Sequence, residues 1–146
     1  MKYSTDRIVG GKPAQSMIPW QVYLPFNTIN GCGGTIIDRC TVLSAAHCGI
    51  KVGQLIRAGT RFKNKNLVTR YVSKVITDEN YYNGFNDGYL LYHDFAILKL
   101  NKKLPKNNPY IKPACLPSLT SWGSSKMNRC FVSGWGLMGM LITSPL

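Results

Sequence analysis

The sequence predicts an all-β domain, and three observations support this fold class. Apolar stretches are short and separated by Gly, Asn, Pro and Lys, and no helical repeat continues beyond about a dozen residues. The chain has 146 residues, of which 45% are hydrophobic, enough to build one packed core. Several short strand candidates follow one another, as is typical of a sandwich or barrel. We therefore expect one compact β unit followed by a tail.

The strand candidates are apolar runs bounded by turn residues. The run 95–100 has apolar side chains on both faces, so this strand is expected to lie deep in the domain. The segment 80–94 mixes Gly, Asn and aromatic residues and is expected to be an exposed loop. The one indication of a helix is the short turn at residues 45–47. The strand candidates cover residues 21–24, 35–37, 41–44, 54–58, 67–76, 95–100 and 130–133.

The chain is strongly basic, with 18 Lys and Arg against 6 Asp and Glu, a net charge of +12 and a pI near 9.7. Such an excess favours a polyanion, an anionic membrane surface or an acidic partner. A solvated surface is the favoured account of the charge, because a polyanion site requires the side chains to converge on one face. The basic residues form two clusters in the sequence: Arg57, Arg61, Lys63, Lys65, Arg70 and Lys74; and Lys102, Lys103, Lys106 and Lys112.

Five cysteines in a chain of this length indicate disulfides and an oxidising compartment, and the odd number leaves one thiol unpaired. No window approaches eighteen consecutive apolar residues, so no membrane span is expected. Lys2, Asp6 and Arg7 stand where a secretory signal would be apolar, so no signal peptide is expected in this chain.

Two residues are candidates for acid–base catalysis. His47 ends an Ala-Ala-His turn, and Asp94 is the first residue of the largely apolar run Asp-Phe-Ala-Ile-Leu-Lys-Leu. A neutral imidazole accepts a hydroxyl proton best when a carboxylate holds its other nitrogen. An unpartnered carboxylate beside an apolar strand is costly, so we expect Asp94 to pair with His47. His93 is the competing base and is expected to face solvent.

A zinc site is the alternative reading of the same region, because Cys32, Cys40 and Cys48 lie eight residues apart and close to His47 in the sequence. The close Cys-x-x-Cys pairs typical of such sites are missing. We therefore expect no metal and no cofactor.

The motifs, taken in order, resemble those of the chymotrypsin and trypsin family of serine endopeptidases, over residues 7–136. The resemblance implies a trypsin-like antiparallel β-barrel, with the first barrel and the beginning of the second. It rests on Arg7-Ile-Val-Gly-Gly, Pro19-Trp-Gln-Val, Cys32-Gly-Gly, Ala45-Ala-His-Cys, Asp94-Phe-Ala-Ile-Leu, Ala114-Cys-Leu-Pro and Ser133-Gly-Trp-Gly.

In this resemblance His47 is the general base and acid, and Asp94 orients it. The bond between Arg7 and Ile8 is the site at which an activating protease cleaves a zymogen. The substrate is a protein or peptide, and the enzyme is secreted. Segment 59–76 contains no Asp or Glu, which argues against the calcium-binding loop of some family members.

The resemblance also implies a disulfide between Cys32 and Cys48 that anchors the histidine turn, and partners outside this span for Cys115 and Cys130. Cys40 is expected to be a small buried thiol.

The family's nucleophilic serine lies in a Gly-Asp-Ser-Gly-Gly motif, and no serine of this chain stands in that context. We therefore expect an N-terminal portion of a peptidase that is inactive by itself, since loss of the serine alone costs about 10⁶ in turnover. The expected divisions are a propeptide-like segment 1–7, a first barrel 8–119, and a second-barrel start with an atypical tail 120–146. Two alternatives remain open: a non-catalytic homologue that acts as a binding or decoy module, and a chain that folds only with a separate second half.

Overall fold

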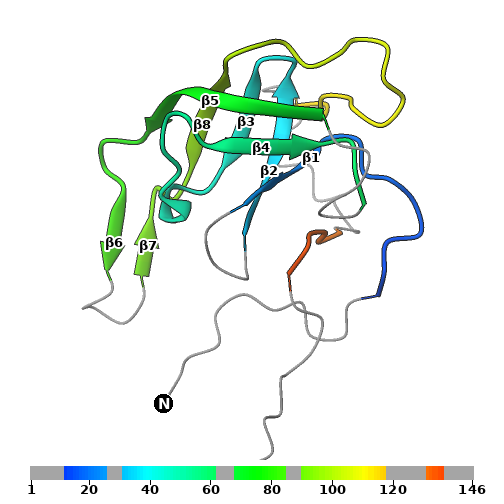
Figure 1. Ribbon diagram of the computed structural model, residues 1–146. Helices are drawn as coiled ribbons and strands as arrows, with labels where there is room; N and C mark the ends of the chain where they lie inside the picture. Colours follow the sequence, from blue (N-terminus) through cyan, green and yellow to red (C-terminus); the bar gives the residue numbers. More distant parts are fainter. Residues whose placement is uncertain (1–11, 26–30, 62–67, 85–89, 118–130, 137–146) are drawn as a thin grey trace, which may run out of the picture.

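The computed structural model describes residues 12–25, 31–61, 68–84, 90–117 and 131–136. These residues are almost entirely β-structure, as the sequence predicts, with one short 3₁₀ turn, η1 (Figure 1). The elements are β1 (Gln21–Leu24), β2 (Cys32–Asp38), β3 (Thr41–Ser44), η1 (Ala46–Cys48), β4 (Leu55–Ala58), β5 (Val68–Thr77), β6 (Tyr82–Gly84), β7 (Leu90–Tyr92) and β8 (Ala96–Leu100).

Six strands close into an antiparallel barrel in the order β1-β2-β3-β8-β5-β4. Closure pairs both sides of every strand, so the barrel has no free edge. Two irregularities interrupt the ladders, one in β2 between Ile36 and Asp38 and one in β5 between Val72 and Lys74. Such bulges bend a strand and help a sheet to close.

The core is formed by the inward side chains of the barrel strands. In β8, Ala96, Leu98 and Leu100 are buried, whereas Lys99 is exposed. The expectation that this strand lies deep in the domain holds for one face, whereas on the other face Ile97 is half-buried and Phe95, just before the strand, is 44% exposed. The fully buried large side chains are Val22, Leu24, Ile36, Val42, Ile56, Val72, Leu98 and Leu104.

The segment predicted as a loop contains a second small sheet, the hairpin of β6 and β7, which stands apart from the barrel at one side (Figure 1). Tyr82 pairs with Tyr92 across the two strands, and their ring centroids lie 6.4 Å apart. Cross-strand aromatic pairs stabilise antiparallel sheets. The pairing of these two tyrosines explains why a segment whose composition suggests turns forms two short strands.

The strand predicted for residues 130–133 is also wrong. Residues 131–133 are irregular, and Cys130 lies outside the described residues. Phe131 is 93% exposed and Val132 is 78% exposed, so these side chains lack the packing that makes such a sequence a strand.

β2 begins three residues earlier than the sequence predicts, because Cys32, Gly33 and Gly34 pair with β1. Gly34 is needed there, since a Cβ at this position would lie 2.7 Å from Cγ1 of Val42. Within the described ranges no helix is long and apolar enough to cross a membrane.

Candidate active site

The barrel topology brings His47 and Asp94 together, although they are 47 residues apart. β3 and β8 run antiparallel, and Ser44 at the end of β3 pairs with Ala96 at the start of β8. The residues after Ser44 and the residues before Ala96 therefore emerge at the same end of the barrel. His47 lies in η1 just after β3, and Asp94 lies just before β8.

The two side chains form a direct hydrogen bond, with 2.7 Å between Nδ1 of His47 and Oδ2 of Asp94. An ionised carboxylate only accepts, so Nδ1 carries the proton in the neutral ring. Nε2 then carries the lone pair and is the nitrogen that can accept a proton. The imidazole is 39% exposed and the carboxylate 20%, so the ring is open to an incoming group while its partner is covered.

The backbone of η1 supplies a second contact to the same carboxylate, since the amide of His47 donates to Oδ1 of Asp94 at 2.8 Å. Burial is the largest single influence on the pKa of Asp94 and acts to raise it. The hydrogen bonds from the ring and backbone of His47 act in the opposite direction and together prevail, so the pKa of Asp94 lies below its ordinary value. Asp94 is therefore an anion at neutral pH.

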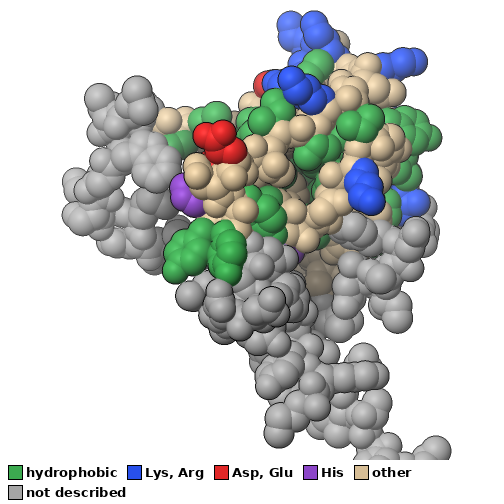
Figure 2. All heavy atoms as spheres, turned by 90° about the vertical axis from the view of Figure 1, so that its left-hand side faces the viewer, with side chains coloured by type: hydrophobic (Ala, Val, Ile, Leu, Met, Phe, Trp, Pro, Cys, Tyr) green, Lys and Arg blue, Asp and Glu red, His purple; other side chains and the backbone are tan. Residues whose placement is uncertain are grey.

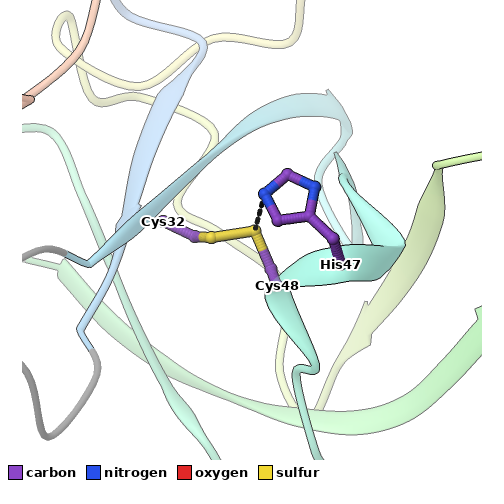
Figure 3. Close-up of side chains that lie close together, drawn as sticks. All are labelled: Cys32, His47 and Cys48. Carbon is purple, nitrogen blue, oxygen red and sulfur yellow. Dashed lines mark hydrogen bonds between the residues drawn. A yellow bond between two sulfur atoms is a disulfide. The ribbon is translucent and has the colours of Figure 1, made fainter. Parts of the chain in front are cut away.

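A disulfide joins Cys32 to Cys48, as the sequence resemblance implies, with 6.2 Å between their Cα atoms. It ties η1 to the start of β2 and thereby fixes the turn that carries His47. Figure 3 shows the imidazole ring beside this disulfide, with Nε2 turned toward Sγ of Cys48 at 3.9 Å. A disulfide sulfur has no proton to donate, so the Nε2 lone pair stays available.

Cys32, His47 and Cys48 place three potential metal-ligand atoms within 4.8 Å of one another. Metal sites use thiolates, and here both sulfurs are consumed in a covalent bond to each other. The zinc alternative is further weakened by Cys40, which lies outside this group, in the turn between β2 and β3. Cys40 is a partly buried free thiol and Cys115 an exposed one.

His93 lies next to Asp94 in the chain but does not join it. Its Nδ1 lies 3.2 Å from Oδ2 of Asp78, in the segment after β5, and its ring is 51% exposed. Sequence reasoning placed His93 toward solvent and missed this contact. The sequence carries no local signal for this contact, because the two residues lie 15 positions apart.

A groove opens beside Asp94 on the surface formed by β1, β2 and β3. Its walls are mainly apolar, and several of these side chains are well exposed, Trp20 at 45% and Phe131 at 93%. Apolar lining of this kind suits an extended chain or a packed partner. The groove is lined by Trp20, Gln21, Gly33, Gly34, Thr35, Leu43, Ser44, Ala45, Asp94, Phe95, Phe131, Val132 and Ser133.

The comparisons with known proteins agree on one family. The family model Trypsin matches residues 8–143. Coagulation factor IX of Cavia porcellus is 36% identical over 138 residues, which cover 89% of this chain and 46% of that protein. Transmembrane protease serine 9 of Rattus norvegicus is 33% identical over 142 residues, covering 92% of this chain and 13% of that protein.

Among solved structures, kallikrein-related peptidase 10 superposes with a TM-score of 0.54 and 30% sequence identity, over 68% of this chain and 43% of the other. The chain thus spans less than half the length of the curated relatives that it matches. The family match and the barrel agree, and the chain belongs to the trypsin family of serine proteases.

Proposed function

We propose that this chain carries the proton-transfer half of a peptide-hydrolysing site of the acyl-transfer type. His47 is the general base and acid, and Asp94 is its orienting anion. The observation that carries the proposal is the double contact of one carboxylate with both the ring and the backbone of His47, at 2.7 and 2.8 Å. This arrangement selects the tautomer with a basic Nε2 and stabilises the imidazolium that forms in the reaction.

In the proposed reaction, Nε2 of His47 takes the proton of a serine hydroxyl while the hydroxyl oxygen bonds to the carbonyl carbon of the substrate. The imidazolium, held by Asp94, then returns this proton to the leaving amine as the peptide bond breaks. A water molecule repeats the sequence to release the acyl group. The attacking serine must come from outside these 146 residues, because none of their serines stands in a Gly-Asp-Ser-Gly-Gly motif. We therefore propose that this chain alone does not hydrolyse peptides.

Zymogen activation at the bond between Arg7 and Ile8 is part of the same proposal. These two residues lie outside the described residues, and support comes from the family match, which begins at residue 8. The disulfide between Cys32 and Cys48 supports an extracellular location, because such bonds persist in oxidising compartments. The substrate class in this proposal is a protein or peptide.

The test is complementation of the chain with a separately produced second half of a trypsin-family enzyme that carries the serine. We expect turnover of a peptide ester by the mixture and none by either part. His47→Ala in the chain should abolish turnover, and Asp94→Asn should lower it by about 10⁴. Cys115→Ser, which changes an exposed free thiol, is the matched control and should leave turnover unchanged. Ester turnover by the unmixed chain, or full complementation by the His47→Ala variant, contradicts the proposal.

One contact favours a second candidate function. In this alternative the chain is a non-catalytic module that binds a sulfated polysaccharide. The guanidinium of Arg70 donates from Nε and Nη2 to the backbone carbonyl of Lys103, at 3.1 and 2.8 Å. This contact joins the two basic clusters of the sequence. Lys74 and Lys99 are also paired across β5 and β8.

No carboxylate in the described part of the chain forms an ion pair with Arg70, Lys74, Lys99, Lys102 or Lys103. Figure 2 shows Lys and Arg side chains gathered along the upper edge of one face. Positive charge gathered on one face is the requirement for binding a polyanion. Two members of the first cluster, Lys63 and Lys65, lie outside the described residues.

Heparin chromatography tests this candidate. The chain should elute at clearly higher salt than the Lys103→Gln variant, whereas Lys51→Gln, in the segment between η1 and β4, also removes one charge and should elute close to the unchanged chain. Equal elution of the two variants contradicts a localised site. Tighter retention on DNA than on heparin would favour a nucleic acid instead.

A further inference from the structure

We propose that Asp78 and His93 form a positioning pair that holds Asp94 in place against His47. Both residues lie at strand ends: Asp78 directly follows β5, and His93 directly follows β7. Asp94 is the next residue after His93 and leads into β8. The inference rests on the proposed function for its catalytic meaning, but the placement of Asp94 is measurable without turnover.

The backbone at His93 needs such support. Its φ is 53°, and it is the one residue other than glycine with a positive φ within the described ranges. This left-handed conformation is unfavourable for residues with a Cβ and persists only where surrounding contacts impose it. Phe95 donates its amide to the carbonyl of His93 at 2.8 Å, which closes a tight turn over Asp94.

The acceptor for His93 is itself held rigidly. Oδ1 of Asp78 accepts from the backbone amide of Asn80 at 2.8 Å and from its side-chain amide at 3.1 Å. Oδ2 is thereby directed at Nδ1 of His93, 3.2 Å away. These bonds, that of the Asn80 backbone first, lower the pKa of Asp78, so it is an anion at neutral pH.

Two consecutive residues therefore contact two different parts of the fold. His93 contacts the segment after β5, and Asp94 contacts η1. The register of β5 and β8, in which Thr77 pairs with Ala96, brings the two segments side by side. If the His93 contact is lost, the turn before β8 can relax, and the carboxylate of Asp94 moves away from the ring and amide of His47. The strength of a hydrogen bond falls steeply as its distance and angle depart from their preferred values, so both contacts between Asp94 and His47 would weaken.

The experiment measures the pKa of Asp94 by NMR titration of its carboxyl carbon in the full chain, together with solvent exchange of the Nδ1 proton of His47. In Asp78→Ala the pKa of Asp94 should rise toward its ordinary value of 3.8, and the exchange should accelerate. Removal of a nearby negative charge acting only through space would lower the pKa of Asp94. The sign of the shift therefore separates positioning from simple electrostatics.

Three further variants complete the test. Asp78→Asn removes the charge but keeps an acceptor for Asn80, and it should raise the pKa of Asp94 even if Asp78→Ala does not fold. His93→Ala removes the contact but keeps the Cβ that disfavours a positive φ, and it should behave like Asp78→Ala. His93→Asn tolerates a positive φ and can donate to Asp78, so it should retain most of the wild-type behaviour.

Glu79→Gln is the matched control, because it removes a neighbouring negative charge that forms no hydrogen bond or ion pair with the described part of the chain. It should leave the Nδ1 proton unchanged. An unchanged or lowered pKa of Asp94 in both Asp78 variants overturns the inference, as does wild-type behaviour of His93→Ala. Failure of the complementation assay with an intact NMR result would instead count against the proposed function alone.

Discussion

The carboxylate of Asp94 spans the side chain and the backbone of one residue, His47, with Oδ2 on the ring nitrogen at 2.7 Å and Oδ1 on the amide at 2.8 Å. The carboxylate thereby fixes the orientation of the imidazole ring relative to the main chain of η1. Rotation of the carboxylate would break both bonds at once, so the pair is a two-point contact that resists small displacements.

The first prediction concerns acid stability. The folded-state pKa of Asp94 is depressed, so its contribution to stability is present above the unfolded value of 3.8 and is lost as pH falls through the lower folded value. We expect Asp94→Asn to lower the free energy of unfolding by about 1 kcal/mol at pH 7, since the charged hydrogen bonds are partly solvent-screened. Urea unfolding should show this difference shrinking below pH 3.8. A difference that stays constant across this range contradicts the assignment.

Loss of the disulfide should be costly. The double variant Cys32→Ser, Cys48→Ser opens a loop with a sequence separation of 16, which corresponds to about 3 kcal/mol in the chain-entropy account. Urea denaturation measures the change, and reduction of the wild-type chain should reproduce it. Cys40→Ser, at a free thiol, is the control. A control that loses as much stability as the double variant would show that the effect is not due to the bridge.

Two adjacent glycines provide a matched pair. A Cβ at Gly34 would lie 2.7 Å from Cγ1 of Val42 and 3.0 Å from Cγ2 of Val22, in the close-packed wall of the barrel. We expect Gly34→Ala to lower the free energy of unfolding by about 1 to 3 kcal/mol. At Gly33 the nearest atom to an added Cβ is 3.9 Å away, so Gly33→Ala should be neutral or slightly stabilising. Equal effects in thermal unfolding would refute the orientation of β2.

The barrel core is tested at Leu98, which is fully buried in β8. Leu98→Ala should cost about 2 to 5 kcal/mol, because it removes buried methyl groups and leaves a cavity. Leu116 is 63% exposed, and Leu116→Ala should change the free energy of unfolding by less than about 0.5 kcal/mol. Similar losses for the two variants in urea denaturation would contradict a closed barrel with Leu98 at its centre.

Most barrel strands were predictable because their apolar pattern is local. β1 and β3 have the predicted bounds, and β4 differs from its prediction by one residue. β2 was predicted too short, because Gly33 and Gly34 resemble turn residues unless it is known that the side chain of Val42 crowds Gly34.

The hairpin of β6 and β7 was missed for the opposite reason. Its strands are three residues each and depend on the pairing of Tyr82 with Tyr92, a contact between segments that composition alone assigns to turns. The pairing of His93 with Asp78 was missed because its partners lie 15 residues apart on different strand ends.

The sequence by itself predicted the all-β class and, through its family resemblance, the disulfide between Cys32 and Cys48 and the pairing of His47 with Asp94. Tertiary structure alone decided that Asp94 contacts His47 at two points and that His93 contacts Asp78 instead. The physical reason is the antiparallel register of β8 with β3 and β5, which places chain segments far apart in sequence at one end of the barrel. Local patterns specify which residues can form a hydrogen bond, but strand pairing specifies which of them meet.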